Sequence, residues 1–216
     1  FTPTATEPDD SVFNEHFKGI KKFGLYFGSI TNYKGVYVLA EALTKFLREN
    51  PDYHFVFVGR EIFPEDPDNP PWQRISQTLG DFKDRIHRLQ SLKHNQLFPI
   101  IEKSAFVALP SLADNLPNTA LESMALGKVL IGTDGRSFEQ LIDDNFSGFL
   151  CRPGDSESLL EAMNRAAALS DDEAAEMGER ARERIDQLRP EVVVAQLVDF
   201  YREVIAAHPK NWQPKE

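Results

Sequence analysis

Short apolar runs alternate with amphipathic stretches along most of the chain. Two such runs, residues 23–27 and 53–58, each end at a glycine and are typical of buried parallel strands. Between them, residues 36–50 carry apolar side chains at helical spacing, so the three segments predict a right-handed β–α–β unit. The same pattern predicts further strands at residues 84–89, 105–109, 129–132 and 148–150, and helices at residues 72–79, 95–103 and 137–142. Residues 62–71, rich in Pro and Asp, predict a loop.

This alternation predicts an α/β fold, a Rossmann-like parallel sheet with helices on both faces. After residue 155 the pattern favours extra C-terminal helices only, at residues 171–189 and 191–208. The second of these helices has an apolar side made of Val194, Leu197, Val198, Tyr201, Val204 and Ile205. We therefore expect a linker with a short helix at residues 1–20, one domain at residues 21–189, and a C-terminal helix and tail at residues 190–216.

The most informative stretch runs from Ala113 to Gly127 and reads ADNLPNTALESMALG. It combines a polar loop, a proline suited to the first turn of a helix and a glycine suited to its end, with Asn115 or Leu116 expected near the cap. The first N–H groups of such a helix have no partner within it and lie at the positive end of its dipole. This arrangement favours a phosphate group.

Two carboxylates flank the expected phosphate site, Asp114 before the helix and Glu122 about one turn inside it. Carboxylates are poor ligands for anions and good acceptors for sugar hydroxyls, so the combination predicts a nucleotide-sugar. Each residue also has a plainer interpretation, Asp114 as a helix cap and Glu122 as an ordinary helical glutamate. Their register with Pro117 and Gly127 favours the binding interpretation.

Composition narrows the range of partners. The 216 residues carry 34 acidic against 24 basic side chains and a net charge of −10, which argues against a nucleic-acid partner. The single cysteine, Cys151, rules out an intrachain disulfide and a cysteine-based metal cluster. No apolar run approaches 18 residues, so no membrane-spanning helix is predicted. Because the chain begins without Met and with a stretch typical of a linker, we expect it to be a fragment of a longer protein.

Other chemistries find little support in the sequence. No Gly-x-Gly-x-x-Gly follows the first predicted strand, no Walker sequence is present, and the five histidines lack metal-ligand spacing. Ser111 and Ser123 lie outside any nucleophile elbow. The Asn145-Phe-Ser147 match to an N-glycosylation acceptor is interpreted as chance.

On the residues of the 113–127 stretch, the chain resembles the C-terminal, donor-binding domain of the family 4 (group 1) retaining GT-B glycosyltransferases. The similarity rests on two acids eight positions apart followed by a Met-Ala-x-Gly turn, and it extends over roughly residues 22–165. The family usually has Glu where this chain has Asp114, whose side chain is shorter by one methylene. The resemblance implies half of a GT-B fold, with a nucleotide-sugar bound by residues 21–189 and a crossover helix after them.

The resemblance also assigns roles to individual residues. Lys34 and Asp114 are the expected catalytic residues: Lys34 takes up charge on the donor diphosphate, and Asp114 accepts from the donor sugar. Glu122 accepts from the ribose hydroxyls. The remaining expected donor-binding residues are Gly28, Ser29, Gly59, Arg60, Leu89, Asn115, Leu116, Pro117, Asn118 and Thr119. Without the 113–127 stretch, Lys34 would be interpreted as a solvated lysine in a loop. Arg60 has two equally good interpretations, contact with the phosphate or a charge on the surface.

One departure from the family pattern is Ser29, which stands where the family usually has an Arg that binds the diphosphate together with the Lys. A bidentate cation is therefore lost. Three consequences stay open: a neighbouring cation compensates, the enzyme is weaker, or the diphosphate sits differently. In the turn after the next strand, Glu139 is expected to be a capping-box residue with Ser137 or Arg136.

The resemblance implies that the whole enzyme transfers a sugar from a nucleoside-diphosphate sugar, with UDP-sugar as the expected donor. The acceptor, a saccharide or a lipid-linked saccharide, is expected on an N-terminal domain absent from this chain, and the fragment alone is expected to be inactive. No cofactor and no metal are expected. The expected location is cytoplasmic, with peripheral membrane association through the missing half. The alternatives are a non-catalytic module that binds a nucleotide or phospholigand, which Ser29 favours, and an epimerase, which would need further catalytic carboxylates.

Overall fold

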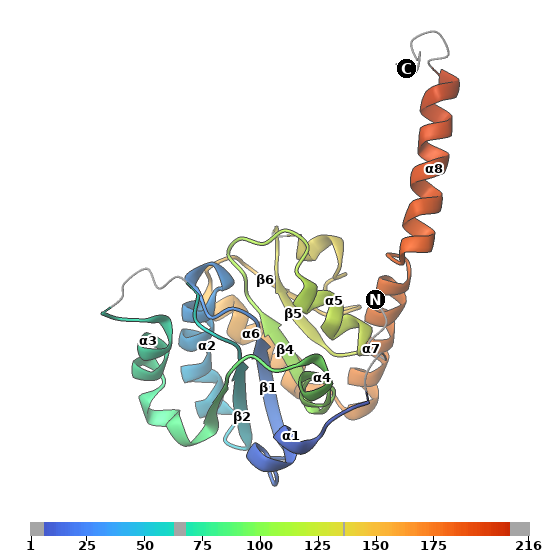
Figure 1. The fold of residues 1–216 in the computed structure, drawn as a ribbon. Coiled ribbons are helices and arrows are strands. Elements are labelled where there is room, and N and C mark those ends of the chain that lie inside the picture. The colour runs from blue at the N-terminus through green and yellow to red at the C-terminus, as the bar shows by residue number, and fades with distance from the viewer. Residues whose placement is uncertain (1–6, 63–67, 136, 208–216) are drawn as a thin grey trace.

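The computed structural model describes residues 7–62, 68–135 and 137–207. Parts of the expected linker (residues 1–6), of the expected loop (residues 63–67) and of the expected tail (residues 208–216) lie outside the described residues, as does Arg136. The described residues comprise a layered α/β region and one helix that extends from it (Figure 1).

Six parallel strands form one sheet in the order β3-β2-β1-β4-β5-β6 (Figure 1). Their bounds are β1 (Lys22–Phe27), β2 (Tyr53–Val58), β3 (Ile86–Leu89), β4 (Phe106–Leu109), β5 (Leu130–Thr133) and β6 (Phe149–Cys151). Strand β1 pairs with both β2 and β4, so the progress of the chain across the sheet reverses between β1 and β4. In open sheets of this kind, a ligand crevice forms outside the carboxyl ends of the strands at that reversal.

The central strands are apolar throughout because helices cover both faces of the sheet. All residues of β4 and β5 are buried, and β1 exposes only its first residue, Lys22. Helices α2 (Val36–Glu49), α3 (Pro71–Thr78) and α6 (Ser156–Ala168) form one layer, in which α2 contacts the other two. Helices α4 (His94–Lys103) and α5 (Asn118–Ala125) connect β3 to β4 and β4 to β5 across the opposite face (Figure 1).

Most predicted elements are present, with shifted ends. The predicted strand at residues 84–89 begins only at Ile86, because residues 80–85 form the 3-10 turn η2 (Gly80–Arg85). Arg85 holds this turn: its guanidinium donates to the carbonyl oxygens of Leu47 and Tyr53, at 2.7 and 3.3 Å. The other 3-10 turns are η1 (Asn32–Lys34) and η3 (Phe138–Gln140), the second of which occupies the predicted helix at residues 137–142.

Part of the expected linker packs onto the domain. Helix α1 (Ser11–His16) contacts α4. Phe17, which follows it, is 1% exposed, and its ring stacks on that of Phe23 in β1 with 6.0 Å between centroids. Phe17 therefore belongs to the hydrophobic core, and Val12 and Phe13 of α1 pack against that core.

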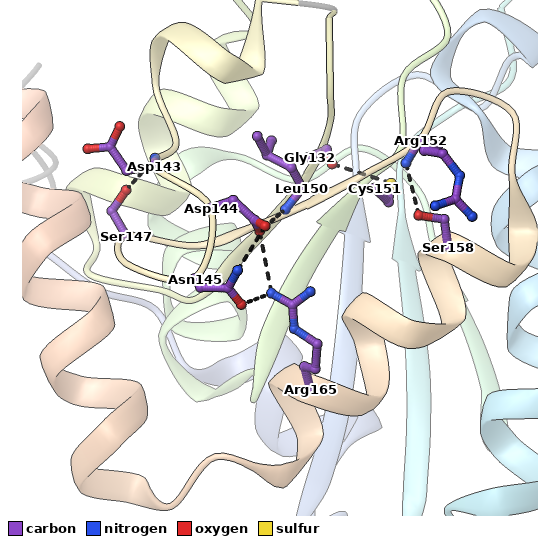
Figure 2. A network of polar contacts seen from close by, with 10 residues as sticks. All are labelled: Gly132, Asp143, Asp144, Asn145, Ser147, Leu150, Cys151, Arg152, Ser158 and Arg165. Atoms are coloured by element: carbon purple, nitrogen blue, oxygen red, sulfur yellow. Dashed lines mark hydrogen bonds and ion pairs between the residues drawn. The ribbon is translucent and has the colours of Figure 1, made fainter.

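Polar contacts join the edge strand β6 and the loop before it to α6 (Figure 2). Arg165 of α6 contacts both Asp144 and Asn145, and the Asn145 amide donates to Asp144 at 2.9 Å. After β6, the N–H of Arg152 donates to Ser158 Oγ at 3.0 Å. Asn145, the residue of the N-glycosylation match, thus has its side chain engaged in this network and adopts a φ of 65°.

The last two helices differ in how they pack. Helix α7 (Asp171–Asp186) packs against α5, whereas α8 (Pro190–Ala207) extends away from the domain (Figure 1). No residue of α8 is buried, and its exposed apolar side chains include Val194, Leu197, Val198, Tyr201, Val204 and Ile205. Within the described ranges, no helix is both long enough and apolar enough to cross a membrane.

Candidate functional site

A pocket of about 320 Å³ lies outside the carboxyl ends of β1 and β4, at the reversal point of the sheet. Eight of the expected donor-binding residues line it: Gly28, Ser29, Lys34, Asp114, Leu116, Pro117, Asn118 and Thr119. They come from two segments that are far apart in the sequence, the loop after β1 and the segment from the end of β4 into α5. The fold therefore gathers them at the edge where ligands of open α/β sheets bind.

Two glycines allow these loops to approach one another closely. Gly35 adopts a φ of 70°, and a Cβ there would lie 1.8 Å from the carbonyl oxygen of Pro110, the residue after β4. Gly59 adopts a φ of 153°, and a Cβ there would lie 1.8 Å from the carbonyl oxygen of Gly28. Any other residue at either position would push the loops apart. The glycines thus determine how closely the ends of β1, β2 and β4 meet.

Lys34 and Asp114 meet directly in the pocket. The Lys34 Nζ lies 2.6 Å from Asp114 Oδ2, and Ser111 Oγ donates to the same oxygen at 3.0 Å. The other carboxylate oxygen accepts from the N–H of Asn115 at 3.0 Å. Asp114 thus has its side chain fixed by three donors, which differs from the plainer interpretation of a helix cap. Lys34 is held over the pocket instead of extending into solvent.

The amino end of α5 borders the same pocket without a side-chain cap. The helix begins at Asn118, with Pro117 at the N-cap. The expectation that Pro117 occupies the first turn was wrong: its ψ of 119° is extended, and its carbonyl accepts the first helical bonds, from Ala120 and Leu121. Because no side chain in the described part of the chain caps this end, the N–H groups of Asn118 and Thr119 are available to a ligand.

Tyr26 and Ser29 form a contact that the sequence did not suggest. The Tyr26 hydroxyl donates to the carbonyl oxygen of Ser29 at 2.6 Å. Burial, together with the nearby charge of Asp114, raises the pKa of Tyr26 well above its ordinary value, so this hydroxyl stays protonated and keeps donating. This hydrogen bond therefore fixes the position of the Ser29 backbone. Among the described residues that line the pocket, Lys34 is the cation, and the exposed Arg60 is not one of them.

The other expected donor-binding residues are not part of the lining of this pocket. Gly59 follows β2, and its N–H donates to the carbonyl oxygen of Leu89 at the end of β3, at 3.0 Å. Asn115 is exposed in the loop before α5. Glu122 is buried in α5, with 8% of its surface exposed, and its Oε1 lies 3.5 Å from Nε2 of His94.

The environment of Glu122 affects its ionisation. Burial raises the pKa of this carboxyl above the ordinary value of 4.5, and the nearby His94 acts in the opposite direction. A buried carboxylate is stabilised when donors reach it. Glu122 is therefore suited to accept hydrogen bonds from hydroxyl groups of a ligand.

Ser137 contacts the loop that carries Asp114. We expected Glu139 to form a capping box with Ser137 or Arg136. For Ser137 this was wrong: it is the N-cap residue of η3, but its side chain makes no capping hydrogen bond. Its Oγ donates instead to the carbonyl oxygen of Asp114 at 3.0 Å. Sequence reasoning missed the contributions of Tyr26, Ser111, Ser137 and His94. A hydroxyl or imidazole near a strand end was the only local signal for them.

A second hollow, of about 550 Å³, lies at the opposite, amino ends of the strands. Four of its lining residues are lysines: Lys21, Lys22, Lys103 and Lys128. The carboxyl ends of α4, α5 and α6 converge there, and Lys128 donates to the carbonyl oxygen of Glu102 at 2.9 Å. Ammonium groups at helix carboxyl ends compensate the negative ends of the dipoles.

The described part of the chain contains no group of three or more His, Cys, Asp or Glu side chains that could hold a metal ion.

Comparison with known proteins agrees with this architecture. The family model described as "Glycosyl transferases group 1" matches residues 9–184. The N-acetyl-alpha-D-glucosaminyl L-malate synthase of Bacillus anthracis is 28% identical over 189 residues, which are 86% of this chain and 46% of that protein. The chain spans 35% to 46% of the length of the first three curated relatives that it matches.

Solved structures share the fold. The Anabaena protein Alr3699/HepE in complex with UDP-glucose matches with a TM-score of 0.72 and 20% identity, over 92% of this chain and 54% of that one. The C-terminal domain of the group 1 glycosyl transferase LpcC from Francisella tularensis matches with a TM-score of 0.71 and 18% identity. That match covers 87% of this chain and 97% of that domain. At these identities the likeness concerns the fold alone.

Proposed function

The chain belongs to the group 1 glycosyl transferases, and from this premise we propose that it is the donor-binding half of a retaining enzyme that uses a UDP-sugar. The acceptor, a saccharide or a lipid-linked saccharide, is held by an N-terminal half that completes the GT-B fold. The enzyme works in the cytoplasm, and the N-terminal half provides any peripheral contact with a membrane.

One observation carries this proposal. A lysine, an aspartate and the uncapped amino end of a helix surround one pocket at the reversal point of the sheet. An ammonium group and free N–H groups attract a diphosphate, whereas a carboxylate repels it and attracts hydroxyls. A nucleotide-sugar carries both kinds of group next to each other. The Anabaena protein, which has the same fold, was crystallised in complex with UDP-glucose, and this supports the same class of donor here.

The proposed reaction depends on stabilising the leaving group. As the bond between the sugar and the diphosphate breaks, negative charge grows on the diphosphate oxygens. In this proposal Lys34 and the amino end of α5, which border the same pocket, stabilise that charge, which is electrostatic catalysis by preorganised groups. Asp114 orients the sugar through its hydroxyls, and Glu122 accepts from the ribose. In this proposal the donor binds without a metal ion.

Helix α8 has a separate proposed role. Its apolar side chains lie on a helix with no buried residue, although the domain below it is well packed. A helix of this kind needs a partner surface. We assign it to the N-terminal half, where it crosses over and joins the two halves. Residues 21–189 then form the nucleotide-sugar-binding domain, and residues 190–216 form the crossover helix and tail.

Calorimetric titration of the chain with UDP, UDP-glucose and GDP-mannose tests the proposal. We expect UDP and UDP-glucose to bind, and Glu122→Ala to abolish most of the affinity for both. Glu157→Ala, at an exposed glutamate in the first turn of α6, is the matched control and should leave binding unchanged. Absence of binding by all three nucleotides would contradict the proposal. The isolated chain should show little or no sugar transfer, since it lacks the acceptor half.

A second candidate function is a module that binds a nucleotide or a phospholigand without catalysis. Ser29 favours it, because the pocket has one lysine where the family usually has a lysine and an arginine. This candidate predicts that UDP and UDP-glucose bind equally well and that Asp114→Asn affects neither. The transferase predicts a preference for UDP-glucose that Asp114→Asn removes.

A further inference from the structure

His94 is the group that faces the buried carboxylate of Glu122. It is the first residue of α4, and its Nε2 lies 3.5 Å from Glu122 Oε1. The imidazole ring stacks on Phe98, one turn further along, with 5.2 Å between centroids and 10° between the planes. Phe98 is itself buried, so the ring that supports the imidazole is fixed. The orientation of His94 is therefore set by packing, and its Nε2 is directed at Glu122.

The side chain of His94 is nevertheless 65% exposed, whereas that of Glu122 is 11% exposed. The pair thus spans the boundary between solvent and the body of the domain. The imidazole therefore lies on the solvent side of the Glu122 carboxylate. His94 is consequently placed to influence both the direction of the carboxylate and the approach of the ligand.

Glu122 needs such a partner. A carboxylate that accepts from two neighbouring hydroxyls must be ionised and must present both oxygens in one plane. Burial opposes the ionisation of Glu122, and the nearby His94 favours it. At 3.5 Å the contact is longer than a strong hydrogen bond. Contacts of this kind in ligand-free sites are often long and shorten when the ligand binds.

We propose that His94 is a positioning residue for the donor nucleotide: it orients the Glu122 carboxylate toward the ribose and so makes the site select ribonucleoside over 2′-deoxyribonucleoside diphosphates. This inference rests on the proposed function, because it requires that Glu122 binds the ribose. His94 acts through Glu122. The proposed specificity concerns the hydroxyls of the ribose, while the diphosphate stays with Lys34 and α5.

The plainer role for His94 is stacking that stabilises the first turn of α4. His94→Phe separates the two roles, because the aromatic ring on Phe98 is kept and Nε2 is lost. His16→Phe is the matched control: His16 lies in α1, which contacts α4, and its ring lies beside that of Phe17. Thermal unfolding of both variants checks that the fold is retained.

The test is calorimetric titration of the chain with UDP and with 2′-deoxy-UDP. We expect His94→Phe to weaken UDP binding about fivefold, the size of one modest hydrogen bond, and to weaken 2′-deoxy-UDP binding by clearly less. In the Glu122→Gln background, His94→Phe should have no further effect, since coupled residues are not additive. His16→Phe should change neither affinity.

The outcomes separate this inference from the proposed function. If Glu122→Gln weakens UDP binding but His94→Phe does not, or if His94→Phe weakens both nucleotides equally, the role of His94 is overturned and the proposed function stands. An effect of His94→Phe that persists in the Glu122→Gln background overturns it as well. If wild-type chain binds neither nucleotide, the proposed function fails and this inference fails with it.

Discussion

The ammonium group of Lys34 lies 2.6 Å from a carboxylate oxygen of Asp114, although eighty residues separate the two in the sequence. The contact joins the loop after β1 to the loop after β4. It places a cation that suits a diphosphate next to an anion that suits hydroxyls. Because the two are paired before any ligand arrives, their positions are set in advance and little reorganisation is needed on binding.

Replacement of Lys34 should weaken binding of the diphosphate. Lys34→Ala removes a charge-assisted hydrogen bond, which is worth about 1.5–3 kcal/mol. We expect a loss of UDP affinity of this size in a calorimetric titration. Lys45→Ala is the matched control, because Lys45 also pairs with a carboxylate, Glu157, but on the exposed surface of α2. An unchanged UDP affinity in Lys34→Ala would remove this residue from the site.

Glu122 should give a characteristic dependence of stability on pH. Burial raises the pKa of this carboxyl in the folded chain above 4.5, so the folded chain holds the proton more tightly than the unfolded chain does. The contribution of Glu122 to the unfolding free energy therefore falls as pH rises from 4.5 through the raised pKa, and stays low above it. Glu122→Gln should then be more stable than wild type at pH 7.5, while binding UDP more weakly.

Urea denaturation at pH 4, 5.5 and 7.5 measures this effect. The difference between Glu122→Gln and wild type should be greatest at pH 7.5 and smallest at pH 4. Glu157→Gln, at an exposed position of α6, provides the control and should show no such trend. A stability difference for Glu122→Gln that is the same at all three values would contradict the burial argument.

Gly59 should tolerate no side chain. A Cβ at this position would lie 1.8 Å from the carbonyl oxygen of Gly28, and the φ of 153° is strained for any other residue. We expect Gly59→Ala to lower the unfolding free energy by about 2 kcal/mol or more. Gly80→Ala is the comparison, because a Cβ there meets nothing within 4 Å, and its effect should stay within about 0.5 kcal/mol. Equal stabilities of the two variants would show that the loops are free to separate.

Removal of α8 should leave the domain intact. Because none of its residues is buried, a chain that ends at Arg189 should melt within about 2 °C of the full chain and bind UDP equally well. Removal of α7 as well gives the contrast, since α7 buries Met177, Ala181 and Ile185 and its loss should lower the melting temperature strongly. A fall of several degrees on removal of α8 alone would mean that this helix packs on the domain itself.

Local patterns in the sequence were sufficient for the strands and for most helices. The run at residues 53–58 predicted β2 with its observed bounds, because six consecutive residues fit a buried strand and a glycine ends it. The helix at α5 was predicted from Pro117 and Gly127, and Gly127 does adopt the left-handed φ of 66° that follows a helix end. The start of β3 was misplaced, because the carbonyl groups that Arg85 binds belong to residues 47–53.

The contacts within the candidate site were harder to predict. Lys34, Asp114 and Glu122 could be selected because their residue types and spacing matched a known pattern. The partners Ser137, Tyr26 and His94 could not, since each touches its target only after distant loops have closed on one another. The spacing of residues along the chain does not predict such contacts. The placement of Pro117 at the N-cap instead of in the first turn likewise depends on one backbone angle, its ψ of 119°.

The proposed function depends above all on where the diphosphate binds. A crystal structure of the chain with bound UDP-glucose measures this directly. We predict diphosphate oxygens within hydrogen-bonding distance of the N–H groups of Asn118 and Thr119 and of Lys34 Nζ, with Glu122 on the ribose. A ligand that binds elsewhere on the domain, or a diphosphate that touches neither α5 nor Lys34, would contradict the account.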